Sequence, residues 1–321
     1  MGAGMTDQVS RAAPISAADR ASVVWDTPAQ AARYCAWGVP FVVRTSGNLG
    51  GRIPEPPMPG AQRDDRQNQP AVLFDFFSGK TASGRSIFVL AHNRAAVFAS
   101  CDAQVAAQEL DSLIHLRVAA LAREAVFVHA GVVGWGDRAL VLPGKSHSGK
   151  STLVAALVAA GATYYSDEYA VIDLQGRVCA FPRRLRLRPD VTREGNGGGH
   201  IGPPGLDGKA LPASGAGASG VDANGERLPP LAARWVLHLE YRPGAVWKPA
   251  ELTPGQTLLT LLENTVAVRR QSELTLRTLK LALADARGWQ SERGEAAESA
   301  AAVVSLLERG ATPHGLPEGL R

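Results

Sequence analysis

Residues 141–153 have the sequence VLPGKSHSGKSTL, whose residue types and spacing match the phosphate-binding pattern GxxxxGK[ST]. The two glycines of the pattern are Gly144 and Gly149, and Lys150 and Ser151 complete it. Glycines let backbone N–H groups curve around a phosphate, and the start of a following helix adds partial positive charge. Lys150 can reach the β- and γ-oxygens of a nucleotide, and the Ser151 hydroxyl can hold Mg²⁺. The stretch therefore predicts a nucleotide-binding loop.

We expect this loop to bind the phosphates of ATP together with Mg²⁺. The residues predicted to make the contacts are Gly144, Ser146, Ser148, Gly149, Lys150, Ser151 and Thr152. The amino-acid frequencies of this chain would produce the pattern by chance roughly once in a hundred such sequences. An ordinary glycine-rich turn with an exposed lysine is the structural alternative. A second GKT, at residues 79–81, is excluded because Phe74 stands where the first glycine should be.

Two acidic residues, Asp167 and Glu168, follow the loop after only one predicted helix and one predicted strand. A carboxylate at that distance can lie beside the γ-phosphate and accept a proton from an incoming hydroxyl, as a general base does in phosphoryl transfer. The chain has neither an LSGGQ-type transporter signature nor the NKxD motif of GTPases. This arrangement favours a kinase over a motor ATPase or a GTP switch. The alternative is that both acids are turn residues of a hairpin.

The sequence around the loop alternates strand-like and helix-like segments, which is typical of an α/β domain. The predicted strands are residues 125–133, 138–144, 163–174 (one continuous strand or an extended pair), 176–182 and 235–241. The predicted helices are residues 151–160, 255–267, 273–286 and 296–309. We therefore expect an α/β catalytic domain over residues 125–321. A flexible insertion is predicted at residues 194–230, where glycine, proline and polar residues leave too little apolar content to pack.

The chain before residue 125 predicts a smaller, β-rich unit. Residues 1–26 are predicted to be a loose leader, residues 27–101 a small antiparallel domain, and residues 102–124 a connecting helix. Within the β-rich unit, residues 47–68 are crowded with glycine, proline and polar residues, which predicts a long exposed loop. The predicted strands of this unit are residues 39–43, 71–77, 86–90 and 95–100.

Composition bounds the class of protein. A chain of 321 residues that is 45% hydrophobic is long enough for two compact domains. Cys35, Cys101 and Cys179 are far apart and have neither disulfide-framework nor zinc-ligand spacing, which favours a reducing cytoplasm. No signal peptide or membrane-spanning run is apparent, so no membrane association is expected. The net charge of +4 comes mostly from dispersed arginines, which does not predict a nucleic-acid partner.

Three segments together resemble the catalytic domain of the HPr serine kinase/phosphorylase family. They are FVHAGVV at residues 127–133, LPGKSHSGKSTL at residues 142–153, and GATYYSDEYAVIDLQGRVCAFPRRLRLRP at residues 161–189. The chain is more similar still to the HPr-kinase-like proteins of peptide-modification gene clusters, including lasso peptide kinases. The resemblance covers residues 125–189 and, more weakly, residues 235–307. It implies a P-loop kinase domain of the HPr kinase and phosphoenolpyruvate carboxykinase type.

The resemblance also implies roles for individual residues. Asp167 matches the aspartate that deprotonates the acceptor serine, and Lys150 matches the nucleotide-binding lysine. His129 matches the family histidine near that aspartate; a buried strand histidine without a catalytic role is the alternative. Glu168 stands where the family often has a second aspartate, so the resemblance assigns it either to the metal, with Ser151, or to the charge of the catalytic site.

One stretch departs from the family pattern. In the region that binds the protein substrate in the family, residues 183–189 contain no carboxylate, so HPr itself is not the expected acceptor. Arg184, Arg186 and Arg188 alternate there, which would place them on one face of a strand. They would either meet phosphates or an acidic acceptor, or protect an exposed edge strand with charge.

These observations predict an ATP-dependent kinase that transfers the γ-phosphate to a hydroxyl, most simply a serine of a peptide or small protein. Two alternatives stay open. One is a small-molecule kinase that uses the same loop and Asp167. The other is a noncatalytic ATP-binding partner of a peptide-modifying assembly. Because HPr-type kinases are often oligomers, the resemblance also implies a homo-oligomer.

Overall fold

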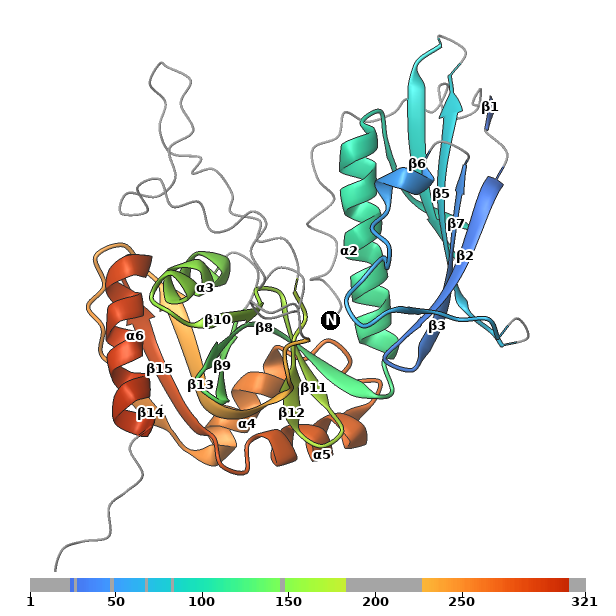
Figure 1. Cartoon of the computed structure of the whole chain (residues 1–321). Helices are drawn as coiled ribbons and strands as arrows, with labels where there is room; N and C mark the ends of the chain where they lie inside the picture. The colour runs from blue at the N-terminus through green and yellow to red at the C-terminus, as the bar shows by residue number, and fades with distance from the viewer. Residues whose placement is uncertain are drawn as a thin grey trace, which may run out of the picture. The chain divides into compact units, whose positions relative to one another are not determined.

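The computed structural model describes residues 24–25, 28–46, 49–66, 69–81, 84–144, 148–182 and 227–311. The chain divides into two compact units, Met1–Arg123 and Glu124–Arg321, each with its own sheet and helices (Figure 1). The protein is therefore mixed α/β, as predicted. Most of the predicted leader and of the predicted insertion lies outside the described residues, and so do Arg184, Arg186 and Arg188.

The first unit contains a seven-stranded sheet in its described part. Its strands are β1 (Val24–Trp25), β2 (Pro28–Ala36), β3 (Val39–Ser46), β4 (Gln62–Arg63), β5 (Val72–Lys80), β6 (Ser86–His92) and β7 (Ala95–Ser100). The order is β4-β2-β3-β5-β6-β7, with β1 also paired to β5. The four strands predicted here are confirmed, but the purely antiparallel sheet is wrong. β3 and β5 run parallel, with Phe41 opposite Val72, because a long crossover connects them.

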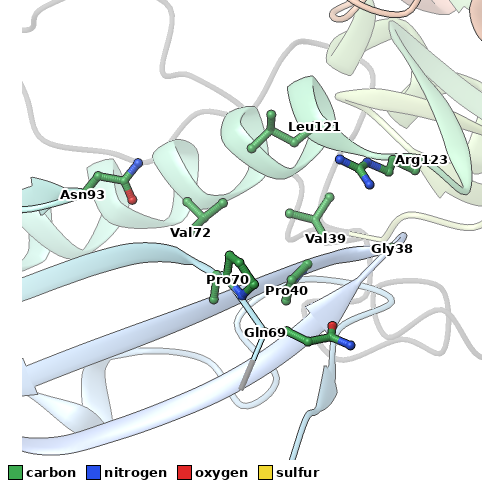
Figure 2. Close-up of a pocket in the computed structure, with 10 residues that line it drawn as sticks. Gly38, Val39, Pro40, Gln69, Pro70, Val72, Asn93, Leu121 and Arg123 are labelled. Atoms are coloured by element: carbon green, nitrogen blue, oxygen red, sulfur yellow. The ribbon is translucent and has the colours of Figure 1, made fainter. Parts of the chain in front are cut away.

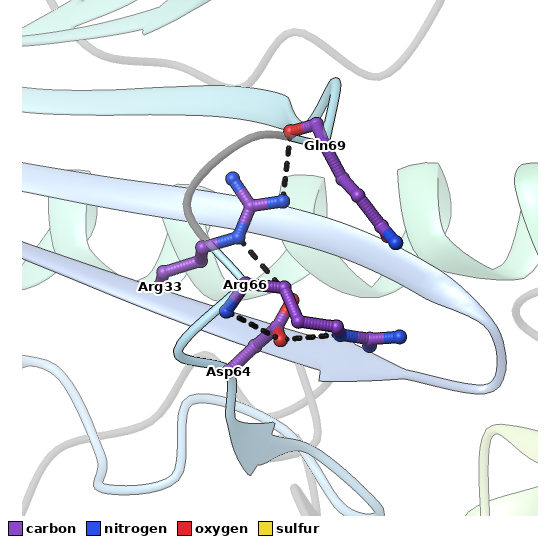
Figure 3. A network of polar contacts seen from close by, with 4 residues as sticks. All are labelled: Arg33, Asp64, Arg66 and Gln69. Atoms are coloured by element: carbon purple, nitrogen blue, oxygen red, sulfur yellow. Dashed lines mark hydrogen bonds and ion pairs between the residues drawn. The ribbon is translucent and has the colours of Figure 1, made fainter.

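The predicted exposed loop at residues 47–68 is partly buried. Leu49 and Met58 are almost fully shielded from solvent, and Asp64 is buried as well. Figure 3 shows how Asp64 is held: its Oδ2 accepts from Arg33 Nε at 3.2 Å, and its Oδ1 accepts from Arg66 Nε at 2.7 Å. Arg33 also donates to the backbone oxygen of Gln69. The network ties the second half of the crossover to β2.

Asp64→Asn should lower the melting temperature at about pH 7. The melting temperature of the variant should also depend less on pH in the acidic range. The hydrogen bond from Arg66 is the largest of the interactions that hold the pKa of Asp64 below its usual value. A depressed carboxyl pKa contributes stability above the unfolded-state pKa of about 3.9, and that stability is lost as pH falls through the folded-state value. The melting temperatures of wild type and variant should therefore converge as the pH falls below the folded-state pKa of Asp64. Asp65→Asn, at an exposed neighbour, is the matched control; equal curves for both variants would contradict the prediction.

The helix expected to connect the units belongs to the first of them. α2 (Ala103–Leu121) begins at Asp102, whose side chain accepts hydrogen bonds from the N–H groups of Gln104 and Val105. Its buried face includes Leu110, Ile114 and Val118. This face packs on β5, β6 and β7, since the helical spacing of its apolar residues forms a stripe toward the sheet (Figure 1).

The second unit contains an eight-stranded sheet in its described part. Its strands are β8 (Ala125–Trp135), β9 (Arg138–Pro143), β10 (Thr163–Ser166), β11 (Tyr169–Asp173), β12 (Arg177–Cys179), β13 (Leu231–Tyr241), β14 (Ala250–Leu252) and β15 (Arg287–Arg293). The order is β10-β8-β11-β12-β13-β15-β14, and β9 pairs with both β8 and β13. The predicted strands are confirmed, whereas β14 and β15 were not predicted.

Helices cover both faces of this sheet (Figure 1). They are α3 (Lys150–Ala159), α4 (Pro254–Glu263), α5 (Ser272–Ala282) and α6 (Ala296–Ala311). Along β9, Ala139 and Val141 join a core with α4 and α5, while Leu140 and Leu142 join a core with α3 and α6. Burial on both faces explains why these strands read as nearly continuous apolar runs.

The predicted helices of this unit are confirmed, with α4 and α5 shorter than expected. α4 begins with a capping box formed by Thr253 and Gln256. It ends before Asn264 because the chain there turns to pair with β8: Asn264 accepts from His129 N at 2.7 Å, and Val266 N donates to Phe127 O. Across the described residues, the structure contains no helix with the length and apolar character needed to cross a membrane.

Candidate active site

The predicted loop lies at the carboxyl ends of three parallel strands. β13 is parallel to β9 on one side and to β15 on the other. The three strands end at Pro143, Tyr241 and Arg293, so these residues share one edge of the sheet. In open α/β sheets, ligands bind outside the carboxyl ends of the strands. The sequence that resembles a phosphate loop therefore occupies the edge where such a loop is expected.

Both glycines of the loop occupy positions that a larger residue would disturb. Gly149 is the N-cap residue of α3 and has φ +78°, a left-handed conformation that favours glycine. A Cβ at Gly144 would lie 2.9 Å from Ser148 Oγ. Ser146 and its two neighbours lie outside the described residues. The described part of the loop thus has the tight backbone that a phosphate cradle needs, opening onto the N-terminus of a helix.

Lys150 folds back across the loop. Its Nζ donates to Gly144 O at 2.7 Å and approaches Ser148 Oγ at 3.4 Å. Burial lowers the pKa of Lys150 to about 8, and the negative charge of Asp167 partly opposes that shift. The ammonium group therefore lies against the loop, within electrostatic range of Asp167. A phosphate in the cradle would replace the carbonyl as its partner.

Ser151 and Thr152 form the first turn of α3 and are half-buried. The described residues contain no group of three or more His, Cys, Asp or Glu side chains that could hold a metal ion. A Mg²⁺ that accompanies a nucleotide takes most of its ligands from phosphates and water, with one or two protein oxygens. The Ser151 hydroxyl at the start of the helix, below a glycine cradle, fits that requirement.

Asp167 and Glu168 interrupt a strand rather than turn a hairpin. β10 and β11 both pair antiparallel with β8, with Ser166 opposite Val132 and Tyr169 opposite His129. The two acids are bend residues that separate β10 from β11 along one line of pairing, so the hairpin alternative is wrong; a bulge in the pairing lies just before them, between Tyr164 and Ser166. Irregularities of this kind re-aim side chains next to functional sites. The Glu168 backbone oxygen accepts from Ala130 N at 3.1 Å, which fixes the acids beside β8.

Asp167 is oriented by Tyr164. The tyrosine hydroxyl donates to Asp167 Oδ1 at 2.9 Å, and Tyr164 itself is buried in the core beneath α3. Among the described residues, Oδ2 of Asp167 has no hydrogen-bond partner. The Ser166 hydroxyl accepts from the N–H groups of Glu168 and Tyr169, and so holds the irregular backbone in place. The carboxylate is fixed through one oxygen while the other can accept a proton.

His129 lies between the loop and the two acids. Its backbone oxygen accepts from Gly144 N at 3.2 Å, and on the other side it is paired with Tyr169. The imidazole packs against the Tyr169 ring with centroids 5.6 Å apart. Burial, and then the charge of Lys150, lower the pKa of His129 to about 4. The side chain is therefore neutral at neutral pH and adds no positive charge beside the loop.

The predicted role of the loop in binding ATP implies an affinity that falls at alkaline pH. The pKa of Lys150 in the free protein is about 8, and only the ammonium form attracts the phosphates. Above that value, the dissociation constant for ATP should rise about tenfold per pH unit. Arginine stays charged over this pH range, so the dissociation constant of Lys150→Arg for ATP should not change with pH, whatever its baseline value. Calorimetric titrations between about pH 7 and pH 10 measure this; a flat wild-type profile would contradict the pKa assigned to Lys150.

A cavity of about 480 Å³ lies elsewhere, in the first unit (Figure 2). Val39, Val72 and Leu121 give it an apolar lining, with Asn93 and Arg123 at its polar positions. It contains none of the residues predicted to act on phosphate. The second GKT, at residues 79–81, also lies in this unit, at the end of β5. Lys80 is exposed there, and the next element is a strand instead of a helix.

Three residues near the loop and acids were not predicted from the sequence: Tyr164, Ser166 and Arg293. Tyr164 and Ser166 act through hydrogen bonds that depend on the bend at Asp167 and Glu168. The ST turn at Ser166 could have been predicted from the serine that precedes two acids. No local signal marks Arg293, which donates to Gly149 O from 144 residues away in the chain.

The structure thus brings Gly144, Lys150, His129 and Asp167 together at one edge of the sheet. The described contacts do not place the Glu168 side chain on a metal. No protein-family model matches the chain, and no curated protein matches it. The resemblance to HPr-type kinases therefore stays a prediction, and the functional proposal rests on the geometry of this site.

Proposed function

We propose that the second unit is an ATP-dependent kinase that transfers the γ-phosphate to a hydroxyl group of a peptide or small protein. The observation that carries the proposal is the placement of Lys150, whose ammonium spans the loop while its pKa responds to Asp167. A phosphate loop, a lysine that contacts it and a nearby carboxylate are the parts that phosphoryl transfer requires.

Binding is assigned to the loop and the start of α3. The backbone N–H groups around Gly149 and the helix N-terminus would hold the phosphates, and Lys150 would neutralise charge on the β- and γ-oxygens. Ser151 would contribute its hydroxyl oxygen to Mg²⁺. When bound, Mg²⁺ would supply charge neutralisation between the β- and γ-phosphates. Glu168 is the second candidate for that ion.

Transfer is assigned to Asp167. The acceptor oxygen would attack the γ-phosphorus while its proton passes to Oδ2 of Asp167, and the bond from the γ-phosphorus to the β,γ-bridging oxygen would break to release ADP. Tyr164 would keep Oδ1 in place during this step. Because His129 is neutral, we assign it to shaping the site beside Asp167 rather than to charge stabilisation.

The acceptor and the assembly are inferred from resemblance. The segments that are similar to HPr-type kinases include the loop, the histidine strand and the two acids. We therefore propose an HPr-kinase-like P-loop domain that acts in the cytoplasm on a serine of a peptide or small protein, as a homo-oligomer. The missing carboxylate in residues 183–189 argues against HPr itself as the acceptor.

The proposal is tested by supplying Mg²⁺ and ATP with an isotopically heavy γ-phosphate to the purified protein in a lysate of its source cells. Mass spectrometry then locates the heavy phosphate. We expect phosphoserine or phosphothreonine on a defined peptide, absent with Lys150→Ala and retained with Lys80→Ala. Label in one metabolite alone would favour the small-molecule kinase. Nucleotide binding without transfer would overturn the kinase assignment in favour of a noncatalytic partner.

A further inference from the structure

A buried arginine from a distant strand contacts the loop. Arg293 is the last residue of β15 and is 2% exposed. Its Nη2 donates to the backbone oxygen of Gly149 at 2.8 Å, and its Nη1 donates to Gly294 O at 3.0 Å. The fork of the guanidinium therefore joins the end of β15 to the N-cap residue of α3.

The absence of a side chain at Gly149 makes this contact possible. A Cβ at that position would collide with Nη2 of Arg293 and would lie 3.7 Å from Tyr241 Cβ. Glycine is thus required here for two reasons, the left-handed backbone and the close approach of the guanidinium. The second reason is absent from the phosphate-loop pattern itself.

The hydrogen bond to Gly149 O fixes more than one atom. The peptide unit is planar, so the oxygen of Gly149 and the N–H of Lys150 point in opposite directions across it. The same oxygen accepts from Leu153 N at 3.2 Å, the first bond of α3. With the oxygen held by two donors, the Lys150 N–H is held toward the N-terminal end of the helix, where a phosphate would bind.

The arginine is itself held by its surroundings. Its guanidinium carbon lies 5.1 Å from the centre of the Tyr241 ring, at the end of β13. The Tyr241 hydroxyl donates to Glu295 Oε1 at 2.9 Å, and Arg242 N donates to Arg293 O. The ends of two strands parallel to β9 therefore set the position of the guanidinium.

We propose that Arg293 is a positioning residue for the phosphate loop. It orients the peptide unit between Gly149 and Lys150, and its buried charge adds positive potential beside the site for a triphosphate. This inference rests on the proposed nucleotide-binding function. It adds that an arginine outside the loop sets the affinity for the phosphate chain, independently of the base or the acceptor.

The same strand provides a control at an exposed arginine. Arg287, at the other end of β15, also stacks on an aromatic ring, with its guanidinium carbon 5.2 Å from the centre of Trp289, and pairs with Glu251 at 2.8 Å. It begins the strand, so it lies at the edge opposite the loop. Arg287→Met and Arg293→Met therefore remove the same kind of side chain, and only the second removes a contact to Gly149.

Calorimetry with Mg²⁺-ATP and with inorganic triphosphate tests the proposal, on the full chain and at a temperature where circular dichroism shows each variant folded. We expect Arg293→Met to weaken both affinities by the same factor, roughly tenfold or more. Arg293→Lys keeps a charge without the fork, and should recover part of the loss. Arg287→Met should bind like wild type. A purely structural role would lower the melting temperature and leave both affinities of the folded protein unchanged.

The outcomes separate the inference from the function on which it rests. If wild type fails to bind Mg²⁺-ATP, the proposed function falls. If wild type binds, and Arg293→Met binds as tightly as Arg287→Met, the positioning role falls and the kinase proposal stands. If Arg293→Met does not fold, Arg293→Lys decides: wild-type affinity for triphosphate would overturn the role, and weakened affinity would support it.

Discussion

Asp167→Asn should abolish most phosphoryl transfer while leaving ATP bound. Asparagine keeps the size of the side chain and an oxygen that can accept from Tyr164, but it cannot take a proton from the acceptor hydroxyl. General-base catalysis typically contributes about 10²–10⁴-fold to a rate, so we expect kcat to fall by about that factor. The loss should appear in kcat, because the base acts in the transition state rather than in binding.

Removal of this carboxylate should not weaken nucleotide affinity. Asp167 places negative charge near Lys150 and the phosphates, so its loss should leave the dissociation constant for ATP unchanged or slightly lower. Asp137→Asn is the control, since that aspartate lies in the turn before β9, at the opposite end of the strand from the loop. Full transfer by Asp167→Asn, measured with γ-labelled ATP at saturating concentration, would remove the base assignment.

Lys150→Met should weaken ATP binding and reduce transfer by about 10²–10³-fold. Removing a single donor that points at the negative charge developing in the transition state typically slows a reaction by about that factor. Methionine keeps most of the apolar stem of lysine, so packing along the loop is preserved. The contacts that Nζ makes with Gly144 O and Ser148 Oγ are lost together with the charge.

In contrast to ATP binding and transfer, the stability of the nucleotide-free protein should not fall in Lys150→Met. The ammonium group is partly desolvated, as its lowered pKa indicates, so replacing it with an apolar group should leave the melting temperature of the nucleotide-free protein unchanged or raise it. Added ATP stabilises wild type in proportion to its binding, and this shift should vanish in the variant. Lys80→Met, which removes the exposed lysine of the GKT at residues 79–81, should keep the full ATP-induced shift. An undiminished ATP-induced shift in Lys150→Met would contradict the phosphate-binding role of the lysine.

The sequence predicted the features that depend on neighbouring residues. Apolar periodicity identified β8, β9, α3 and β13 because each buries its own pattern against a core. Glycine spacing located the loop, since a left-handed residue such as Gly149 must be marked locally. The same local logic excluded the GKT at residues 79–81, where Phe74 lies within a strand and is fully buried.

The missed features all depend on which segments pair. β15 has the sequence RGWQSER, in which polar and charged residues hide the strand pattern, and it is a strand because it pairs with β13 and β14. The parallel pairing of β3 with β5 and the packing of α2 on the first sheet likewise follow from long-range contacts. An exposed loop was predicted from composition at residues 47–68, but ion pairs and packing bury part of it.

The chemistry of the site divides in the same way. Local sequence specifies Gly144, Gly149, Lys150 and Ser151, because a turn, a cap and a helix start require particular residues at fixed spacing. Only the fold brings Asp167 within the field of Lys150 and holds it with Tyr164, because β10 and β11 pair with β8 in one register. Only the fold brings Arg293 to Gly149 O across 144 residues of chain, since parallel strands end at one edge whatever their separation in sequence.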